Sequence, residues 1–115
     1  MSRLRLPKEH IAGGWPLKIK TTNKGDGGGT ASLLDQEVLI EQPQLNDHNA
    51  VDTLIHECLE ISFVAHGVRY GNSKEEWMFV LDHRTFSIVT SELAGTVLKL
   101  LKANGYKESK DEDSN

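Results

Sequence analysis

Residues 47–67 read DHNAVDTLIHECLEISFVAHG and carry the pattern that decides the fold. At about 100° per residue, the apolar side chains of this stretch gather on the side of a helix opposite His56. That apolar side consists of Val51, Leu54, Cys58, Ile61 and Ala65. Asn46 or Asp47 can cap the first turn, and Gly67 can supply a left-handed stop. We therefore expect one long helix here, which packs its apolar side on the core and ends just before the glycine.

Short strands are expected before this helix. Lysines alternate with apolar residues over residues 17–22, which is the period-two pattern of a half-buried strand. Residues 30–34 and 37–41 are expected to form two more strands, in a hairpin or meander. The glycine-rich residues 25–29 predict a flexible loop, and Pro43 is expected to close the sheet region.

A second helix is expected near the end of the chain. Asp82 is well placed to cap it, and Asn104-Gly105 is a typical stop signal. Its apolar stripe, which we expect to join the core, consists of Phe86, Val89, Leu93, Val97 and Leu100. Between the two helices, residues 77–81 form a short apolar run that favours a strand.

These elements predict an α+β fold, in which a short antiparallel sheet of three to four strands is followed by the long helix and a C-terminal helix. The length of 115 residues allows one domain, which we expect to span residues 1–106. Residues 107–115 are polar and acidic, and we expect them to form a disordered tail.

The charge balance excludes several classes of partner. The chain has 13 basic and 17 acidic residues, a formal charge of -4, and no basic stretch interleaved with aromatic residues. Because basic patches supply most of the affinity for nucleic acid, we expect no nucleic-acid partner. No apolar run is long enough for a membrane span, and the first residues lack the apolar centre of a signal peptide, so we expect a soluble, cytoplasmic protein with no membrane partner.

One short motif has side chains that can bind a metal ion and transfer a proton: residues 56–60 read His-Glu-Cys-Leu-Glu. His56 and Glu60 lie about 40° apart on one face of a helix, so they can hold one metal ion together. Glu57 is rotated by about 100° and stands beside the ion, where a carboxylate can take a proton from a water molecule that the ion holds. His10 and His48 lie in polar stretches, and we expect them to be exposed and to play no part.

The chain resembles the small zinc metallopeptidases of the phage type, which are minimal zincins with a short sheet, a His-Glu-x-x-His helix and a final helix. The resemblance covers Leu17 to Gly105, and its most specific part is DTLIHECLE at residues 52–60. It implies a single zincin-like domain with zinc bound through His56 and the residue at position 60, and Glu57 as the catalytic base. Here Glu60 replaces the second histidine, and its negative charge is expected to weaken the effect of the ion on the acidity of bound water.

Three residues compete to be the third ligand. His83 follows the cap of the last helix, and helical geometry places it nearer the packed side of that helix than Glu92. Glu92 matches the gluzincin pattern of a glutamate in the last helix. His66 matches the metzincin spacing, but an unbroken helix carries it about 15 Å along the axis from His56. We therefore expect His83 to complete the site.

The leading hypothesis is a zinc-dependent, peptidase-like hydrolase with His56, Glu60 and His83 as ligands and Glu57 as the general base. Its substrate is expected to be a peptide or protein. The alternative is a catalytically degenerate, metal-stabilised zincin-like domain that binds a protein partner, for which Glu60 and the acidic tail are the motivating features. A metal-free interaction domain is the third hypothesis. A set of histidine and carboxylate ligands also suits iron or manganese.

Overall fold

The computed structural model describes residues 4–23, 28–41, 47–71 and 77–108. In chain order these residues form β1 (Glu9–Ala12), β2 (Trp15–Thr22), β3 (Gly29–Ser32), β4 (Glu37–Glu41), α1 (Asp47–Ala65), β5 (Arg69–Gly71), β6 (Trp77–Phe79) and α2 (His83–Ala103). The sequence-based prediction of an α+β fold with sheet strands before the helices is confirmed.

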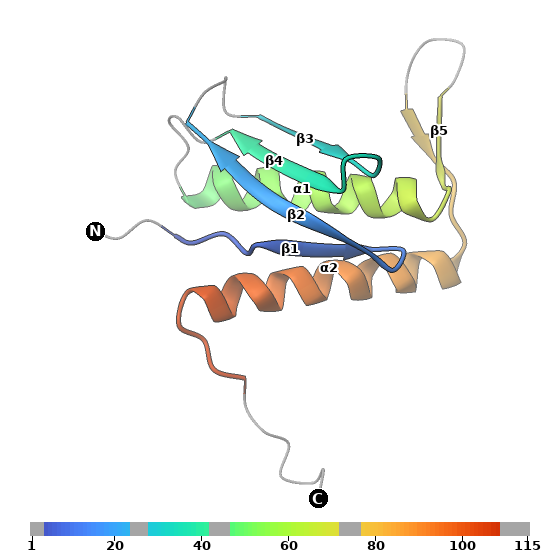
Figure 1. Cartoon of the computed structure of the whole chain (residues 1–115). Coiled ribbons are helices and arrows are strands. Elements are labelled where there is room, and N and C mark those ends of the chain that lie inside the picture. Colours follow the sequence, from blue (N-terminus) through green and yellow to red (C-terminus); the bar gives the residue numbers. More distant parts are fainter. Residues whose placement is uncertain (1–3, 24–27, 42–46, 72–76, 109–115) are drawn as a thin grey trace, which may run out of the picture.

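The first four strands form one sheet in the order β1-β2-β4-β3 (Figure 1). β1, which the sequence pattern does not predict, forms an antiparallel hairpin with β2 that turns at Gly13 and Gly14, both with positive φ. β3 and β4 form the expected antiparallel hairpin. β2 and β4 run parallel, because the chain returns along β3 at the edge before it enters β4. The sheet is therefore mixed, which corrects the expectation of a purely antiparallel sheet.

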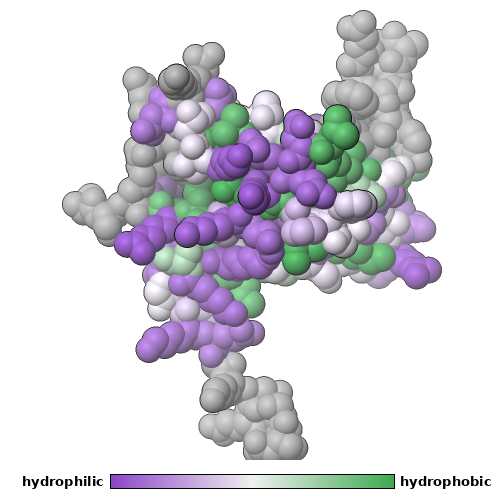
Figure 2. Space-filling model, in the orientation of Figure 1, coloured by the Kyte–Doolittle hydropathy of each residue, from purple (hydrophilic) through white to green (hydrophobic). Residues whose placement is uncertain are grey.

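The core lies between this sheet and the two helices. α1 packs across β1, β3 and β4, and α2 packs beside it along β1 (Figure 1). The buried apolar side chains at this interface include Leu17, Ile19, Val38, Ile40, Leu54, Cys58, Ile61 and Leu100. The lysines of β2 alternate with its buried residues and point outward, where Lys20 pairs with Glu37 at 2.9 Å. Figure 2 shows this outward side of the molecule, which is largely hydrophilic over the strands.

α1 presents its predicted apolar side to the core. Leu54, Cys58 and Ile61 are buried, and α1 ends before Gly67, which has a φ of 69°. Burial, together with the neighbouring Glu57 carboxylate, raises the pKa of Cys58 to about 12. A thiol in this environment does not act as a nucleophile, so the prediction that Cys58 is a small buried residue is confirmed.

α2 begins and ends where the sequence predicts. The Asp82 carboxylate accepts a hydrogen bond from the Thr85 N–H at 2.7 Å, and the helix stops at Asn104. Val89 and Leu100 of the predicted stripe are buried, but Phe86 is 51% exposed. The expectation that Phe86 joins the core was wrong. α2 contacts the end of the β1–β2 hairpin at Glu92, almost two turns after Phe86, and the first turn of α2 extends past the sheet.

Two further segments differ from the predicted elements. β5 and β6 form a two-stranded antiparallel ribbon, in which β6 ends at Phe79 rather than at residue 81. Gly29 belongs to β3 rather than to the expected glycine loop. Residues 24–27, Pro43 and residues 109–115 of the expected tail lie outside the described residues. Neither α1 nor α2 is long and apolar enough to cross a membrane, among the residues described.

His10 is fully buried, which corrects the expectation that it is exposed, whereas His48 is exposed as predicted. The alternation of β1 points the His10 ring toward the helices. One ring nitrogen forms a hydrogen bond with the hydroxyl of Ser62 in α1 at 2.8 Å, and the other with the hydroxyl of Thr96 in α2 at 2.5 Å. Both nitrogens are therefore engaged, and His10 ties the edge of the sheet to both helices.

The stability of this protein is expected to fall in mild acid because of His10. Burial lowers the pKa of His10 below its usual value of 6.5; the nearby Glu92 carboxylate opposes this shift, and Lys99 adds to it. As the pH falls below 6.5, the unfolded chain takes up a proton that the buried ring resists, so the free energy of unfolding decreases. Urea unfolding at pH 7.5 and 5.5 measures this loss, and it should be smaller in His10→Gln. The exposed control His48→Gln should keep the pH dependence of the wild type.

Candidate metal centre

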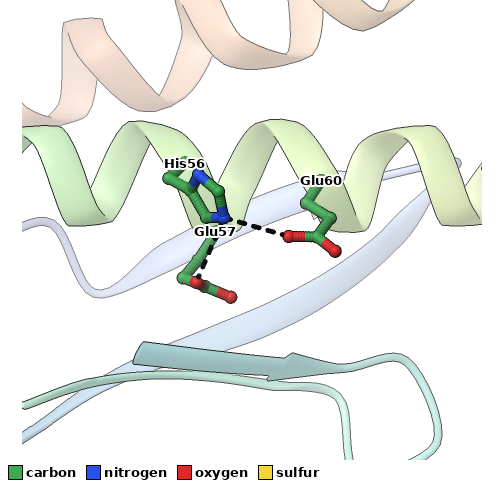
Figure 3. Close-up of side chains that lie close together, drawn as sticks. All are labelled: His56, Glu57 and Glu60. Atoms are coloured by element: carbon green, nitrogen blue, oxygen red, sulfur yellow. Dashed lines mark ion pairs between the residues drawn. The ribbon is translucent and has the colours of Figure 1, made fainter. Parts of the chain in front are cut away.

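Three potential ligands come from one turn of α1. The ligand atoms of His56, Glu57 and Glu60 all lie within 4.8 Å of one another (Figure 3). His56 Nε2 is 3.2 Å from Glu60 Oε2 and 3.9 Å from Glu57 Oε2. The prediction that His56 and Glu60 share one face of a helix is confirmed, and Glu57 points to the same place.

The separations fit a small divalent ion. Zinc lies about 2.0–2.2 Å from an imidazole nitrogen or a carboxylate oxygen, so two ligand atoms at a tetrahedral angle are about 3.4 Å apart. The distance of 3.2 Å between His56 Nε2 and Glu60 Oε2 is close to this value. The Glu57 oxygen is further from the imidazole and suits a group that stands next to an ion. These residues could therefore hold a metal ion, although one imidazole and two carboxylates do not specify which metal.

The three side chains line a cavity between α1 and the edge strand β3. The cavity measures about 550 Å³, and residues 29–33 form its other wall, opposite the His56-Glu57-Glu60 turn and Ile61. Figure 3 shows the three side chains on the side of α1 that faces this strand. A site in this place is open to a ligand and bounded by protein on two sides, which is typical of binding sites for small groups or extended chains.

The side chains of the three residues differ in solvent exposure. The side chain of His56 is 68% exposed, that of Glu60 is 26% exposed, and that of Glu57 is only 12% exposed. Burial raises the pKa of Glu57 above its usual value, the His56 imidazole lowers it, and the Glu60 carboxylate raises it. A carboxylate whose pKa is raised accepts a proton more readily than an exposed one, which is a requirement of a general base.

Gly29 lets β3 lie against this part of α1. A Cβ atom at position 29 would meet the Leu39 carbonyl oxygen at 2.9 Å, Glu57 Cγ at 3.0 Å and Thr53 Cγ2 at 3.1 Å. The sequence does not reveal this role of Gly29, because a glycine inside a run of glycines predicts a loop. The absence of a side chain at Gly29 therefore lets β3 pass close to Glu57, whose side chain is only 12% exposed.

The three candidates for the third ligand lie elsewhere. His66 Nε2 is 2.9 Å from Glu92 Oε2, and the same oxygen accepts a hydrogen bond from the Gly13 N–H at 2.7 Å. These two candidates therefore contact each other, and they join the end of α1 to α2 and to the β1–β2 turn. His83 is exposed at the first residue of α2 and is not part of the group around His56. His83 as the third ligand stays a prediction of the sequence.

The chain matches no protein-family model, no curated protein and no solved structure in the comparisons with known proteins. Function is therefore inferred from the geometry of the α1 turn, from the cavity beside it and from the chemistry of its three side chains.

Gly29→Ala is expected to destabilise the protein by about 1–3 kcal/mol, because the new methyl group has no space between the Leu39 carbonyl and α1. Urea unfolding followed by circular dichroism measures the effect. Gly95→Ala is the matched control: a Cβ at position 95 of α2 meets nothing within 4 Å, so the better helix propensity of alanine should stabilise the protein by about 0.5–1 kcal/mol. Equal stability of the two variants would show that β3 does not pack on α1 as described.

Proposed function

We propose that this protein is a metal-dependent hydrolase that acts on peptide bonds, with zinc as the metal. The observation that carries the proposal is the His56-Glu57-Glu60 group, whose ligand atoms lie within 4.8 Å of one another in a cavity beside an edge strand. Histidine and carboxylate side chains at this spacing are the ligands that zinc takes in catalytic sites.

The roles of the residues follow from their exposure. His56 and Glu60, the closest pair, hold the ion, which when bound polarises the substrate carbonyl and makes a water molecule more acidic. Glu57 holds the proton taken from that water and passes it to the leaving amine. Its position against β3 limits the solvent around it, so its carboxylate oxygen stays directed at the ligand pair rather than at bulk water.

The edge of β3 supports a peptide as the substrate. The Glu41 N–H donates a hydrogen bond to the Gly28 carbonyl oxygen at 2.8 Å, so Gly28 and Glu41 are a hydrogen-bonded pair of the β3–β4 ladder. Along an antiparallel ladder, residue pairs that share backbone hydrogen bonds alternate with pairs that do not. The backbone N–H and C=O of Thr30 therefore point to β4, whereas those of Gly29 and Ala31 point to the outer edge of the sheet, where no other strand of the described residues pairs with β3. An extended peptide can add to such an edge through main-chain hydrogen bonds. It would then lie along the cavity that holds the metal group.

The likeness to small zinc metallopeptidases of the phage type is part of this proposal. The order of sheet, motif helix and final helix is compatible with that likeness. Glu60 in place of the usual second histidine adds a negative charge to the ion, which lowers its power to acidify water. The protein is therefore expected to be a slower hydrolase than one with two histidines, and manganese or iron is a possible replacement for zinc.

The second candidate function is a metal-stabilised domain that binds a protein partner and cleaves nothing. The observation that favours it is that all three donors of the described group come from one turn of one helix, and that only one of them is an imidazole. If Glu57 is itself a ligand, it is not available as a base. The same β3 edge would then bind an extended segment of the partner without cutting it.

The first test of the proposal is metal content. Protein purified without an affinity tag should contain about one zinc ion per chain by elemental analysis. His56→Ala should lower the zinc affinity by at least about 100-fold, since loss of an outer-shell partner alone costs 10- to 100-fold. His48→Ala removes an exposed histidine from the first turn of the same helix and should keep the wild-type affinity. Full zinc occupancy in His56→Ala would rule out this site.

The same titration tests His83. A decrease of tenfold or more in zinc affinity in His83→Ala would establish it as the third ligand and would require the start of α2 to approach α1 when the metal binds. An affinity equal to that of the His48→Ala control would leave the remaining positions around the ion to water and Glu57.

The second test separates catalysis from binding. Glu57→Gln should keep the zinc and the fold but lower the rate of peptide hydrolysis by about 100-fold to 10,000-fold, because the amide cannot accept the proton. The measurement pairs zinc titration with cleavage of a denatured protein substrate followed by mass spectrometry. Loss of zinc from Glu57→Gln would identify Glu57 as a ligand and favour the binding domain. An inert wild type that becomes active in Glu60→His would also favour it.

A further inference from the structure

A second cavity adjoins the metal group on the side away from β3. It measures about 360 Å³ and is lined by His56, Leu59, Glu60, Phe63 and Phe79. His56 and Glu60 also line the cavity along β3, so the two cavities meet at the proposed ligand pair. A group bound in the second cavity therefore lies next to the place where the metal would act.

The walls of this cavity are formed by two separate elements. One face of α1 supplies four of the lining residues, each three or four positions from another: His56, Leu59, Glu60 and Phe63. Phe79 comes from β6, and its ring centroid is 4.7 Å from that of Phe63 at an angle of 40°. The Val80 N–H donates to the Val68 carbonyl oxygen at 2.9 Å, and the Val68 N–H donates to the Phe63 carbonyl oxygen at 3.1 Å, so the chain after β6 is tied to the last turn of α1. The ring pair is thus held beside the helix.

We propose that this cavity is the subsite for a large apolar side chain of the substrate, leucine, methionine or phenylalanine, next to the scissile bond. The inference rests on the proposed function, because it names the substrate residue of the same site. The extended peptide runs along β3, and one of its side chains enters the second cavity at the point where the two cavities join.

Size and polarity select this class of side chain. A cavity of about 360 Å³ falls within the range of about 300–1,000 Å³ that ligand sites occupy, so it has room for the largest apolar side chains. Leu59, Phe63 and Phe79 offer no partner for a buried charge, and Glu60 is engaged by the ion in the metal-loaded protein. An acidic side chain would in addition be repelled by the Glu60 carboxylate. An aromatic or aliphatic side chain gains contacts with both rings.

The first experiment tests the subsite without metal or catalysis. The metal-free protein is titrated with N-acetyl-phenylalanine amide and N-acetyl-alanine amide, and the ring signals of Phe63 and Phe79 are followed by nuclear magnetic resonance. We expect the phenylalanine probe to shift these signals at concentrations where the alanine probe does not. Phe79→Ala should weaken binding of the phenylalanine probe by about fivefold. Phe86→Ala, which removes an exposed ring of α2, should not change it.

The second experiment profiles the cleavage sites of the zinc-loaded protein on a peptide library. Wild type and Phe86→Ala should cut next to leucine, methionine or phenylalanine about tenfold faster than next to alanine. Phe79→Ala should reduce this ratio. Cleavage with no such preference, or with a preference for basic residues, would overturn the subsite while leaving the hydrolase in place. Absence of any cleavage together with the expected probe binding would overturn the hydrolase and keep the apolar subsite, and absence of probe binding would overturn the subsite.

Discussion

Burial of Leu54, Cys58 and Ile61 against the sheet is the constraint on which the site depends. These residues fix the rotation of α1 about its axis, and a helix that turns about 100° per residue then directs every other side chain. His56 must lie away from the core, where its ring is mostly exposed, and Glu57 must lie between the core and the sheet edge. The polar side chains of this turn are therefore positioned by apolar packing of the helix rather than by contacts among themselves.

The difference in exposure between His56 and Glu57 has a second cause: β3 lies close to Glu57. The missing side chain of Gly29 allows the strand to approach Glu57, and the approach removes water from the carboxylate. Removing water from a charged carboxylate costs free energy, which raises its pKa and prepares it to accept a proton. The same edge strand offers backbone groups to an extended chain, so the strand that limits the exposure of Glu57, the base that we propose, also suits the substrate that we propose.

The remaining polar residues of the interior hold the layers together. His10 connects β1 to both helices through Ser62 and Thr96, and the His66–Glu92 pair connects the end of α1 to α2. These contacts give partners to the two ring nitrogens of His10, to His66 Nε2 and to Glu92 Oε2, which would otherwise be costly to bury. His66 and Glu92, two of the candidates for the third ligand, thus pair with each other and join the two helices.

The sequence by itself determined the two helices, the Asp82 cap of α2, the Gly67 stop of α1, the β3–β4 hairpin and the shared face of His56 and Glu60. Each of these depends on residues within a few positions of one another. Only the tertiary structure decided the partners of His10, His66 and Glu92, the parallel pairing of β2 with β4, and the place of Gly29 against Glu57. These contacts join residues that are far apart in the chain. Local periodicity carries no information on which surfaces will meet, since that depends on how all the layers pack at once.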